Sequence, residues 1–284
     1  MKNNNTLIYN FFNRVNGSNF PFVLYFPLLI LVIILIFPYL MKLDPFATNP
    51  SIACSVPSIK YWLGTDEVGR DIFSRIIHGS RITIFIGIIT AVLSCLIGTI
   101  IGLISGYFEG KTDLVITQVV DIALAFPSLL LAIGISIILS SGVFSVIIAI
   151  TISGWAGFAR LLRSHVLVLK KADYILAAKA LGSSHYKIIL KHIIPNSIFL
   201  IIVSCSLRLG SFMLAEAGLS FLGLGVPAPY PTLGGMISSG RDYLLISPWM
   251  PLIPGLVIGI IVLLCNIMGD EIQKIYDPKG NELN

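Results

Sequence analysis

The sequence predicts an all-α protein, built as a polytopic membrane helix bundle of about six transmembrane helices. Its 284 residues are 56% hydrophobic and only 12% charged, whereas ordinary soluble domains carry about 25% charged residues. Six apolar stretches reach the roughly 17–25 residues that cross a hydrocarbon core. Because lipid leaves no backbone polar group unpaired, and these stretches lack the alternation of barrel strands, they are expected to be helices.

The first apolar stretch, from Phe22 to Met41, follows Lys2 and Arg14 and could be mistaken for a signal peptide. Its length of about 20 residues exceeds the roughly 7–15 of a signal-peptide core, and no small-residue cleavage site follows it directly. It is therefore expected to be a retained membrane anchor. The other five spans are expected at residues 82–107, 114–139, 143–159, 197–219 and 251–268.

Glycines recur at a spacing of four in the second expected span, at Gly98, Gly102 and Gly106. Residues four apart share one face of a helix, and small residues on one face let two helices approach closely. The spacing therefore predicts close helix packing along this face.

Basic residues in the loops predict the orientation of the chain. Between the fourth and fifth spans a single acid, Asp173, stands against seven basic residues: Arg160, Arg163, Lys170, Lys171, Lys179, Lys187 and Lys191. Loops rich in Lys and Arg remain in the cytoplasm, so this basic loop is expected there. An even number of spans then places both termini on the same side. The first external loop departs from the pattern, because it carries Lys42, Lys60, Arg70, Arg75 and Arg81.

The spans and the orientation divide the chain into five parts. They are a cytoplasmic N-terminus (1–21), the first transmembrane anchor (22–41), an extracytoplasmic loop (42–81), a core of five transmembrane helices (82–269) and a cytoplasmic tail (270–284). The basic loop lies within the core at about residues 160–196.

The extracytoplasmic loop contains a second helix signal. Thr65, Asp66 and Glu67 predict a helix start with acids in the first turn. The apolar residues that follow share one face of this expected helix: Val68, Ile72, Phe73, Ile76 and Ile77. The pattern favours a short amphipathic helix on the outer membrane surface, with simple packing against the bundle as the alternative.

The basic loop predicts two short helices. Tyr174, Ala178 and Leu181 fall on one face of the first, and Gly182 stands where a glycine would end it. A basic helix pair that stays in water within an otherwise apolar chain favours docking with a partner, and an ordinary cytoplasmic loop is the alternative.

The second expected helix starts at a serine and ends near a proline. Ser183 or Ser184 can cap it, and Lys187 and Lys191 lie one turn apart within it. Pro195 is then expected to stop or kink the chain as the next span begins.

The spacing in this loop, Ala177-Ala178, then Gly182, then Pro195, resembles the coupling loop of ABC importer permeases. In that family the loop docks into the cytoplasmic ATPase subunits. The usual motif opens with Glu-Ala-Ala, whereas this chain has Leu176 in place of the glutamate. The resemblance implies an ATPase-coupling role for six residues: Tyr174, Ala177, Ala178, Gly182, Lys187 and Pro195.

Further sequence blocks narrow the resemblance to one subfamily of these permeases. The segment WLGTDEVGRDIFSRIIHGSRITI at 62–84 is similar to a signature of the dipeptide, oligopeptide and nickel permease subfamily. So are the blocks at 121–127, 218–245 and 268–278. A single-span N-terminus followed by the Gly-Thr-Asp block resembles the second of that subfamily's two permease subunits.

This resemblance implies the type I ABC importer permease fold and a transport subunit that does no chemistry itself. The implied partners are a homologous permease subunit in a heterodimer, two ABC ATPase subunits and an extracytoplasmic solute-binding protein. ATP and Mg would be used by the ATPase, with no cofactor bound by this chain. A di- or oligopeptide is the implied substrate, with nickel or a metal chelate as the alternative. The implied location is the bacterial inner membrane.

Three charged residues lie inside expected spans: Asp121, Arg208 and Glu216. Each charge costs about 2.5–3.5 kcal/mol at the centre of a membrane helix, so such residues usually face a cavity or one another. They are candidates for lining a translocation path, where an acid would suit a peptide ammonium group or a metal cation. A fixed ion pair or a helix-end contact within the bundle is the alternative.

Nothing in the sequence predicts catalysis or a metal centre. There is no G-x-x-x-x-G-K-[ST] phosphate loop, and the four histidines, His78, His165, His185 and His192, suggest no metal cluster. We therefore expect no catalytic residue and no metal ligand. A self-contained secondary transporter is the alternative function, but it would show internal repeats, and none is evident in the sequence.

Overall fold

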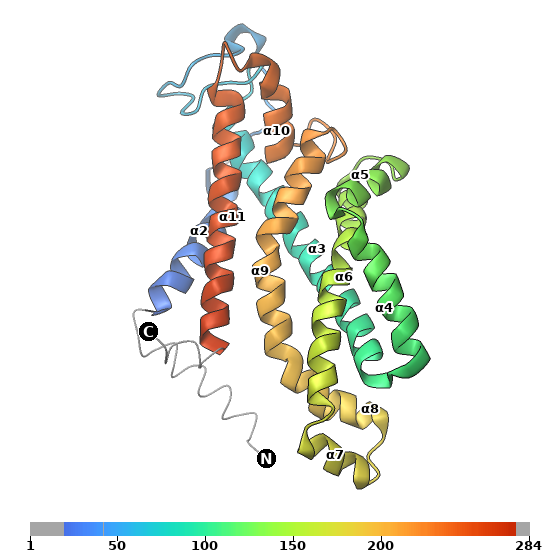
Figure 1. Cartoon of the computed structure of the whole chain (residues 1–284). Helices are drawn as coiled ribbons and strands as arrows, with labels where there is room; N and C mark the ends of the chain where they lie inside the picture. The colour runs from blue at the N-terminus through green and yellow to red at the C-terminus, as the bar shows by residue number, and fades with distance from the viewer. Residues whose placement is uncertain (1–19, 42, 277–284) are drawn as a thin grey trace. The chain divides into compact units, whose positions relative to one another are not determined.

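The computed structural model describes residues 20–41 and 43–276 (Figure 1). Residues 1–19 of the expected cytoplasmic N-terminus, Lys42, and residues 277–284 of the expected tail lie outside the described residues. Within the described part, the chain is helical, and its one isolated bridge joins Thr65 to Asp71. The described residues divide into two compact units, one from 20–41, 43–88, 141–146 and 206–276 and the other from 89–140 and 147–205.

Four helices among the described residues are long and apolar enough to cross a membrane. They are α3 (Ile72–Phe108), α6 (Val143–Leu169), the continuous helix His185–Phe221 that contains α9 (Ile194–Phe221), and α11 (Trp249–Tyr276). The first expected span forms the 22-residue helix α2 (Phe20–Met41). At about 1.5 Å per residue, α2 reaches about 33 Å, which matches the hydrocarbon thickness of a bilayer.

The third expected span is not one straight helix. It forms α4 (Gly110–Ala125) and α5 (Ser128–Ile138), which are bent by 89° relative to each other. Phe126, the residue before Pro127, is extended at φ −85° and ψ 136°. A residue that precedes proline is driven out of the helical region by the proline ring, so the helix breaks at this point. The single span expected at 114–139 is therefore corrected to a bent pair.

The other helix boundaries also differ from the expected ones. The fourth span continues to Leu169 rather than ending at residue 159, so that Arg160 and Arg163 belong to α6 and not to a loop. The last helix continues to Tyr276, past the expected start of the tail at residue 270.

The amphipathic helix expected from Thr65 does not form. Instead, the Asp66 carboxylate accepts hydrogen bonds from the backbone N–H groups of Val68 (3.1 Å) and Arg70 (2.9 Å), and it pairs with the Arg70 guanidinium. These bonds stabilise a turn, because a short acidic side chain that bonds to nearby N–H groups competes with helix formation. The helix begins later, at Ile72.

Asp71 marks this later start. Its Oδ2 accepts a hydrogen bond from the backbone N–H of Ser74 at 3.0 Å, which is the geometry of a helix N-cap. Ile72 and Ile76, expected on the apolar face of a surface helix, are 1% and 3% exposed in the core of the first unit. The alternative, packing within the bundle, is what the structure shows.

The core of the first unit joins α2, α10 (Leu233–Gly240) and α11. In Figure 1, α10 and α2 both lie alongside α11, and both pairs are in contact. Gly234 at the start of α10 is necessary for close packing, because an added Cβ would lie 2.1 Å from the Ala217 carbonyl oxygen. Two short 3₁₀ turns, η1 (Pro50–Ile52) and η3 (Arg241–Tyr243), complete the loops of this unit.

In the second unit, the predicted glycine face of α3 is confirmed. An added Cβ would lie 2.5 Å from the Trp155 carbonyl oxygen at Gly98, and 2.5 Å from that of Ala159 at Gly102. These glycines therefore let α3 approach the backbone of α6 more closely than any larger residue would allow.

Candidate functional site

The basic loop forms two helical segments. These are α7 (Asp173–Ala180) and α8 (His185–Ile188), and α8 leads into a π-helical turn, η2 (Ile189–Ile193), and then into α9. The two helices that the sequence predicts are therefore present. The loop is shorter than the expected 160–196, because α6 and the helix that starts at His185 extend into it from both sides.

Of the two outcomes expected at Pro195, a stop or a kink, the stop does not occur, because the helix continues from His185 to Phe221. A proline in a helix clashes with the carbonyl group four residues earlier, which here belongs to Lys191. In η2 the N–H of Ile194 bonds to the carbonyl of Ile189, five residues earlier. This wider turn accommodates the proline, so the helix passes through Pro195 without ending.

Gly182 ends α7 as predicted. Its φ of +78° is in the left-handed region, and its N–H bonds to the Lys179 carbonyl at 3.0 Å. The N–H of Ser183 bonds to the Ala178 carbonyl, also at 3.0 Å. This pair of bonds is a Schellman motif, which requires glycine because a Cβ is disfavoured at that φ. Ser184 then caps α8 by accepting a hydrogen bond from the Lys187 N–H at 3.4 Å.

The base of the loop is fixed by buried isoleucines. Ile175 in α7, Ile188 in α8 and Ile193 in η2 are at most 3% exposed, and they pack with Leu103 of α3 and Val166 of α6 in one apolar cluster. Burying one such side chain stabilises a fold by about 1.5–3 kcal/mol, so three of them hold the loop firmly on the helix ends.

Polar contacts, which the sequence did not reveal, hold the same loop. The hydroxyl of Tyr107, near the end of α3, lies 2.8 Å from His185 Nδ1 at the start of α8. Lys170 Nζ, just after α6, donates to the Gly106 carbonyl at 2.7 Å and pairs with Glu109 at 2.5 Å. The hydrogen bond from Lys170 holds the pKa of the Glu109 carboxyl below its usual value.

Four large apolar or aromatic side chains of the loop are exposed, among exposed lysines such as Lys179. Leu181 is 87% exposed and Tyr186 is 74% exposed, and Leu176 and Tyr174 of α7 are about half exposed. We call these four residues the apolar tip. Of the residues predicted to couple, Tyr174, Ala177, Gly182, Lys187 and Pro195 are exposed, and Ala178 is partly buried. A loop with a buried base and exposed apolar side chains can dock a protein, because a partner that covers apolar surface removes it from water.

Asp121 pairs with Arg160 rather than with another of the three charges expected inside the spans. Arg160 Nη2 lies 2.5 Å from Asp121 Oδ1, and both side chains are more than half exposed. The pair joins α4 to α6 in the second unit. It lines a cavity of about 180 Å³ together with Arg163, Gly102 and Ser105.

A second ion pair between the same helices was missed. Arg163 donates two hydrogen bonds to Asp113, at 2.6 and 2.7 Å, and the Ser105 hydroxyl donates a third at 2.5 Å. Bidentate pairs of this kind are among the strongest polar contacts in proteins. The expected end of the fourth span at residue 159 places Arg163 in a loop. An extension of that span would have placed Arg163 on a helix that could face Asp113.

Glu216 is buried, with no exposed surface, in the first unit. The hydroxyls of Thr83 in α3 and Ser220 in α9 each donate to its carboxylate at 2.7 Å. Two hydroxyl groups, rather than a basic side chain, therefore hold the Glu216 carboxylate in place. Arg208 lies on the same helix with an exposed side chain.

Helices of membrane-crossing length, joined by a firmly based loop, define an integral-membrane helix bundle. The chain belongs to the family of binding-protein-dependent transport system inner membrane components, whose family model matches residues 98–281. Members of this family are multi-pass transport subunits rather than enzymes.

Several curated relatives are similar over most of their length. The oligopeptide transport system permease protein OppC of Bacillus subtilis (strain 168) is 42% identical over 88% of this chain and 82% of its own. The dipeptide transport system permease protein DppC of Alkalihalophilus pseudofirmus is 41% identical over 87% of this chain and 82% of its own. The glutathione transport system permease protein GsiD of Pectobacterium atrosepticum is 40% identical over 78% of this chain and 74% of its own.

Solved structures share the fold at lower identity. The methionine ABC transporter MetNI, in an inward-facing conformation, matches with a TM-score of 0.60 and 17% identity, over 72% of this chain and 97% of that one. An amino acid ABC transporter matches with a TM-score of 0.54 and 16% identity, over 73% and 94%. These matches establish the helical ABC importer permease fold that the sequence predicted.

Proposed function

We propose that this permease forms one half of the path of an ATP-driven peptide importer. Its relatives are named as oligopeptide, dipeptide and glutathione permeases, and all three substrates are peptides. This common chemistry supports a di- or oligopeptide substrate over the nickel or metal-chelate alternative. In the proposed assembly, a homologous permease subunit completes the path, a binding protein delivers the peptide, and two ATPase subunits bind ATP and Mg.

The observation that carries the proposal is the contrast between the base and the tip of the basic loop. Ile188 has no exposed surface, whereas Leu181 is 87% exposed a few residues away. A rigid base is needed to transmit force, because a flexible loop would absorb the motion of the ATPase. The proposed mechanism is alternating access, in which closure of the ATPase pair moves the loop and, through it, the ends of α3 and α6.

The side of the membrane on which each loop lies follows from the number of times that the chain crosses it. Between residues 43–71 and the loop at 170–184, the chain crosses three times if α3, the α4–α5 pair and α6 each span the membrane. An odd number of crossings puts these segments on opposite sides. With the basic loop in the cytoplasm, we place residues 43–71 outside and both termini inside.

Within the membrane, we propose that Asp121 and Arg208 line the path. Both side chains are exposed in this chain, and Asp121 borders the cavity of about 180 Å³. Glu216 instead supports the path indirectly, because the hydroxyls of Thr83 and Ser220 donate hydrogen bonds to its carboxylate.

The experiment that tests the proposal is uptake into vesicles. The chain is co-expressed with the two ATPase subunits and the second permease from the same gene neighbourhood, and the purified assembly is reconstituted with its binding protein. Uptake of a labelled dipeptide or oligopeptide should require both ATP and the binding protein. ATP-independent uptake by this chain alone would overturn the proposal, and uptake of nickel but no peptide would overturn the substrate.

A further inference from the structure

A cavity of about 500 Å³ lies beside α3 in the first unit. Its volume is within the roughly 300–1,000 Å³ that is usual for small-molecule sites. One face of α3 forms its first wall, because the α3 residues that line it recur at the spacing of a single helix face. They are His78, Arg81, Ile82 and Phe85.

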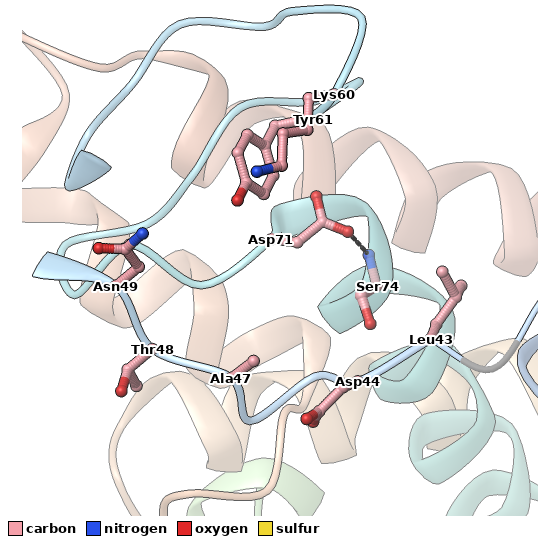
Figure 2. A pocket seen from close by; sticks show the side chains of 10 residues that line it. Leu43, Asp44, Ala47, Thr48, Asn49, Lys60, Tyr61, Asp71 and Ser74 are labelled. Atoms are coloured by element: carbon pink, nitrogen blue, oxygen red, sulfur yellow. Dashed lines mark hydrogen bonds between the residues drawn. The ribbon is translucent and has the colours of Figure 1, made fainter. Parts of the chain in front are cut away.

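The segment around Pro45 forms a second wall, and side chains of α3 hold it in place. Arg75 Nη1 donates a hydrogen bond to the Pro45 carbonyl at 3.2 Å, and His78 Nε2 lies 3.2 Å from the Leu43 carbonyl oxygen. Figure 2 shows the segment from Leu43 to Ala47 passing beneath the first turn of α3. The second wall is therefore fixed to the same helix that forms the first.

The residues just before α10 form a third wall. An added Cβ at Gly79 of α3 would lie 3.5 Å from the Pro231 carbonyl oxygen and 3.4 Å from the Leu233 nitrogen, so this segment packs directly on α3. Thr232 caps α10 by accepting a hydrogen bond from the Gly235 N–H at 3.1 Å. Contacts within the first unit therefore fix three walls of the cavity.

Along α3 the lining of the cavity changes from polar to apolar. Arg81 immediately precedes the apolar stretch at 82–107, so it lies where the hydrocarbon region of the membrane begins. Phe85 lies one turn further along α3, about 6 Å deeper. The exposed apolar face of the helix then continues to Ile88. A molecule that fills the cavity therefore places a polar group beside Arg81 and an apolar body toward the centre of the membrane.

The charge of the cavity selects an anion for its polar end. Among the described residues that line it, Arg81 is always charged and none is acidic. Asp44 lines the separate polar pocket of Figure 2, and its Oδ1 accepts a hydrogen bond from the Phe46 N–H at 2.8 Å. A guanidinium group matches a phosphate through paired N–H donors. In a bilayer, the phosphates of the lipids lie just outside the hydrocarbon region, which is the depth of Arg81.

We propose that this cavity binds one phospholipid, with its phosphate at Arg81 and an acyl chain along Ile82 and Phe85. The lipid belongs to the leaflet on the side of residues 43–71, which the proposed orientation of the chain makes the outer one. The direction of the cavity favours a lipid over a peptide or a second permease. Its polar-to-apolar axis follows a membrane-spanning helix, as a lipid molecule does in a bilayer.

Binding of dioctanoyl phosphatidylglycerol to the purified full-length chain in detergent tests the site without transport or partners. Native mass spectrometry measures the bound probe. Dioctanoylglycerol, which lacks the phosphate, and glycerol 3-phosphate, which lacks the acyl chains, should each bind at least about tenfold more weakly. Equal binding of either compound would overturn the proposal, because a phospholipid site needs both parts of the molecule.

Arg81→Gln should lower the affinity for dioctanoyl phosphatidylglycerol at least about tenfold, because it removes the charged contact with the phosphate. Arg241→Gln is the matched control, since its side chain is 65% exposed and lies outside the cavity. Equal affinities of the two variants for the probe would show that the phosphate does not bind at Arg81 and would overturn the proposal.

Phe85→Ala keeps the test informative if Arg81→Gln does not fold. The ring is 55% exposed, so its loss should disturb the fold little, while the affinity for the probe should fall about fivefold through lost apolar contact. Phe108→Ala is the matched control, at a residue 53% exposed at the other end of α3. If the two variants bind the probe equally, the acyl chain does not lie along this face and the proposal is wrong.

The second permease is the alternative occupant, and the assembled transporter distinguishes it from a lipid. The assembly of this chain with the second permease and the ATPase subunits should still bind dioctanoyl phosphatidylglycerol in a manner that depends on Arg81. If assembly excludes the probe, a protein contact fills the cavity and the lipid proposal is overturned. Peptide uptake is a separate measurement, so this failure would leave the proposed function intact.

Discussion

The hydroxyl of Tyr107 lies 2.8 Å from Nδ1 of His185, across 78 residues of sequence. The two rings also meet edge to face, with centroids 5.5 Å apart. The contact joins the end of α3 to the start of α8, the helix that carries Tyr186 of the apolar tip. A displacement of the loop by a docked ATPase would therefore reach a membrane-spanning helix through this pair as well as through the buried isoleucines.

Tyr107→Phe should weaken this connection and leave the fold intact. It removes one hydrogen bond, worth about 0.5–1.5 kcal/mol, and keeps the ring contact. We expect the ATPase to co-purify normally while peptide uptake per ATP hydrolysed falls. Tyr230→Phe is the control, because that side chain is 57% exposed and lies outside the basic loop. Equal ratios of peptide uptake to ATP hydrolysis in the two variants would contradict a coupling role for the contact between Tyr107 and His185.

Leu181→Asp should release the ATPase. The side chain is 87% exposed, so the charge will disturb the fold by no more than about 0.5 kcal/mol, but it would be desolvated in a docked complex. Leu245→Asp, at a residue 98% exposed in the other unit, is the matched control. Co-purification of the ATPase subunits measures the effect, and retention by Leu181→Asp would argue against docking through the apolar tip.

Leu176 stands where the family has glutamate, and it is 51% exposed in the apolar tip. We expect the ATPase groove that receives Leu176 to be apolar and to lack a basic residue opposite this side chain. Leu176→Glu should therefore bury an unpaired carboxylate in the docked complex and weaken docking. We expect less ATPase to co-purify with Leu176→Glu than with Leu176→Met. If the glutamate variant binds more ATPase, the groove offers a basic residue at this position and the prediction is wrong.

The two ion pairs between α4 and α6 should respond differently to substitution. In the Asp113–Arg163 pair the side chains are 18% and 31% exposed, so Asp113→Asn should lower the free energy of unfolding by about 1.5–3 kcal/mol. In the Asp121–Arg160 pair they are 57% and 59% exposed, so Asp121→Asn should cost about 0–1 kcal/mol. Asp121→Asn should nevertheless lower uptake. Thermal unfolding and uptake, measured on both variants, test the distinction, and normal uptake by a stable Asp121→Asn would exclude a path role.

Acid should weaken the contact between Lys170 and Glu109. The pKa of the Glu109 carboxyl is lowered chiefly by its bond to Lys170, with a smaller contribution from Lys171 and an opposing one from Asp113. A lowered pKa in the folded state stabilises the protein above the unfolded pKa, and that stabilisation is lost as pH falls through the folded value. We expect little change in stability from this pair between pH 7 and pH 5, which is about 0.7 unit above the pKa of a free glutamate, and a loss of stability below pH 5. Lys170→Met should remove this acid dependence, and Lys191→Met, in the same loop, should keep it.

Features that depend on nearby residues could be predicted from the sequence. Gly182 ends α7 because a left-handed residue is needed there, and the neighbouring sequence already shows it. The glycine face of α3 follows from a spacing of four. The helix start predicted at Thr65 was wrong. Asp66 could either cap a helix or close a turn, and its ion pair with Arg70 stabilises the turn.

By itself, the sequence determined that the chain is a helical membrane protein with a basic loop, because hydrophobic length and charge placement are properties of local segments. Only the tertiary structure decided which charges meet. Asp113 lies 50 residues from Arg163, and Glu216 lies 133 residues from Thr83. Electrostatic and hydrogen-bond energies depend on distance in space. The folded chain therefore determines that Asp121 is exposed beside Arg160, whereas Glu216 is enclosed between two hydroxyls.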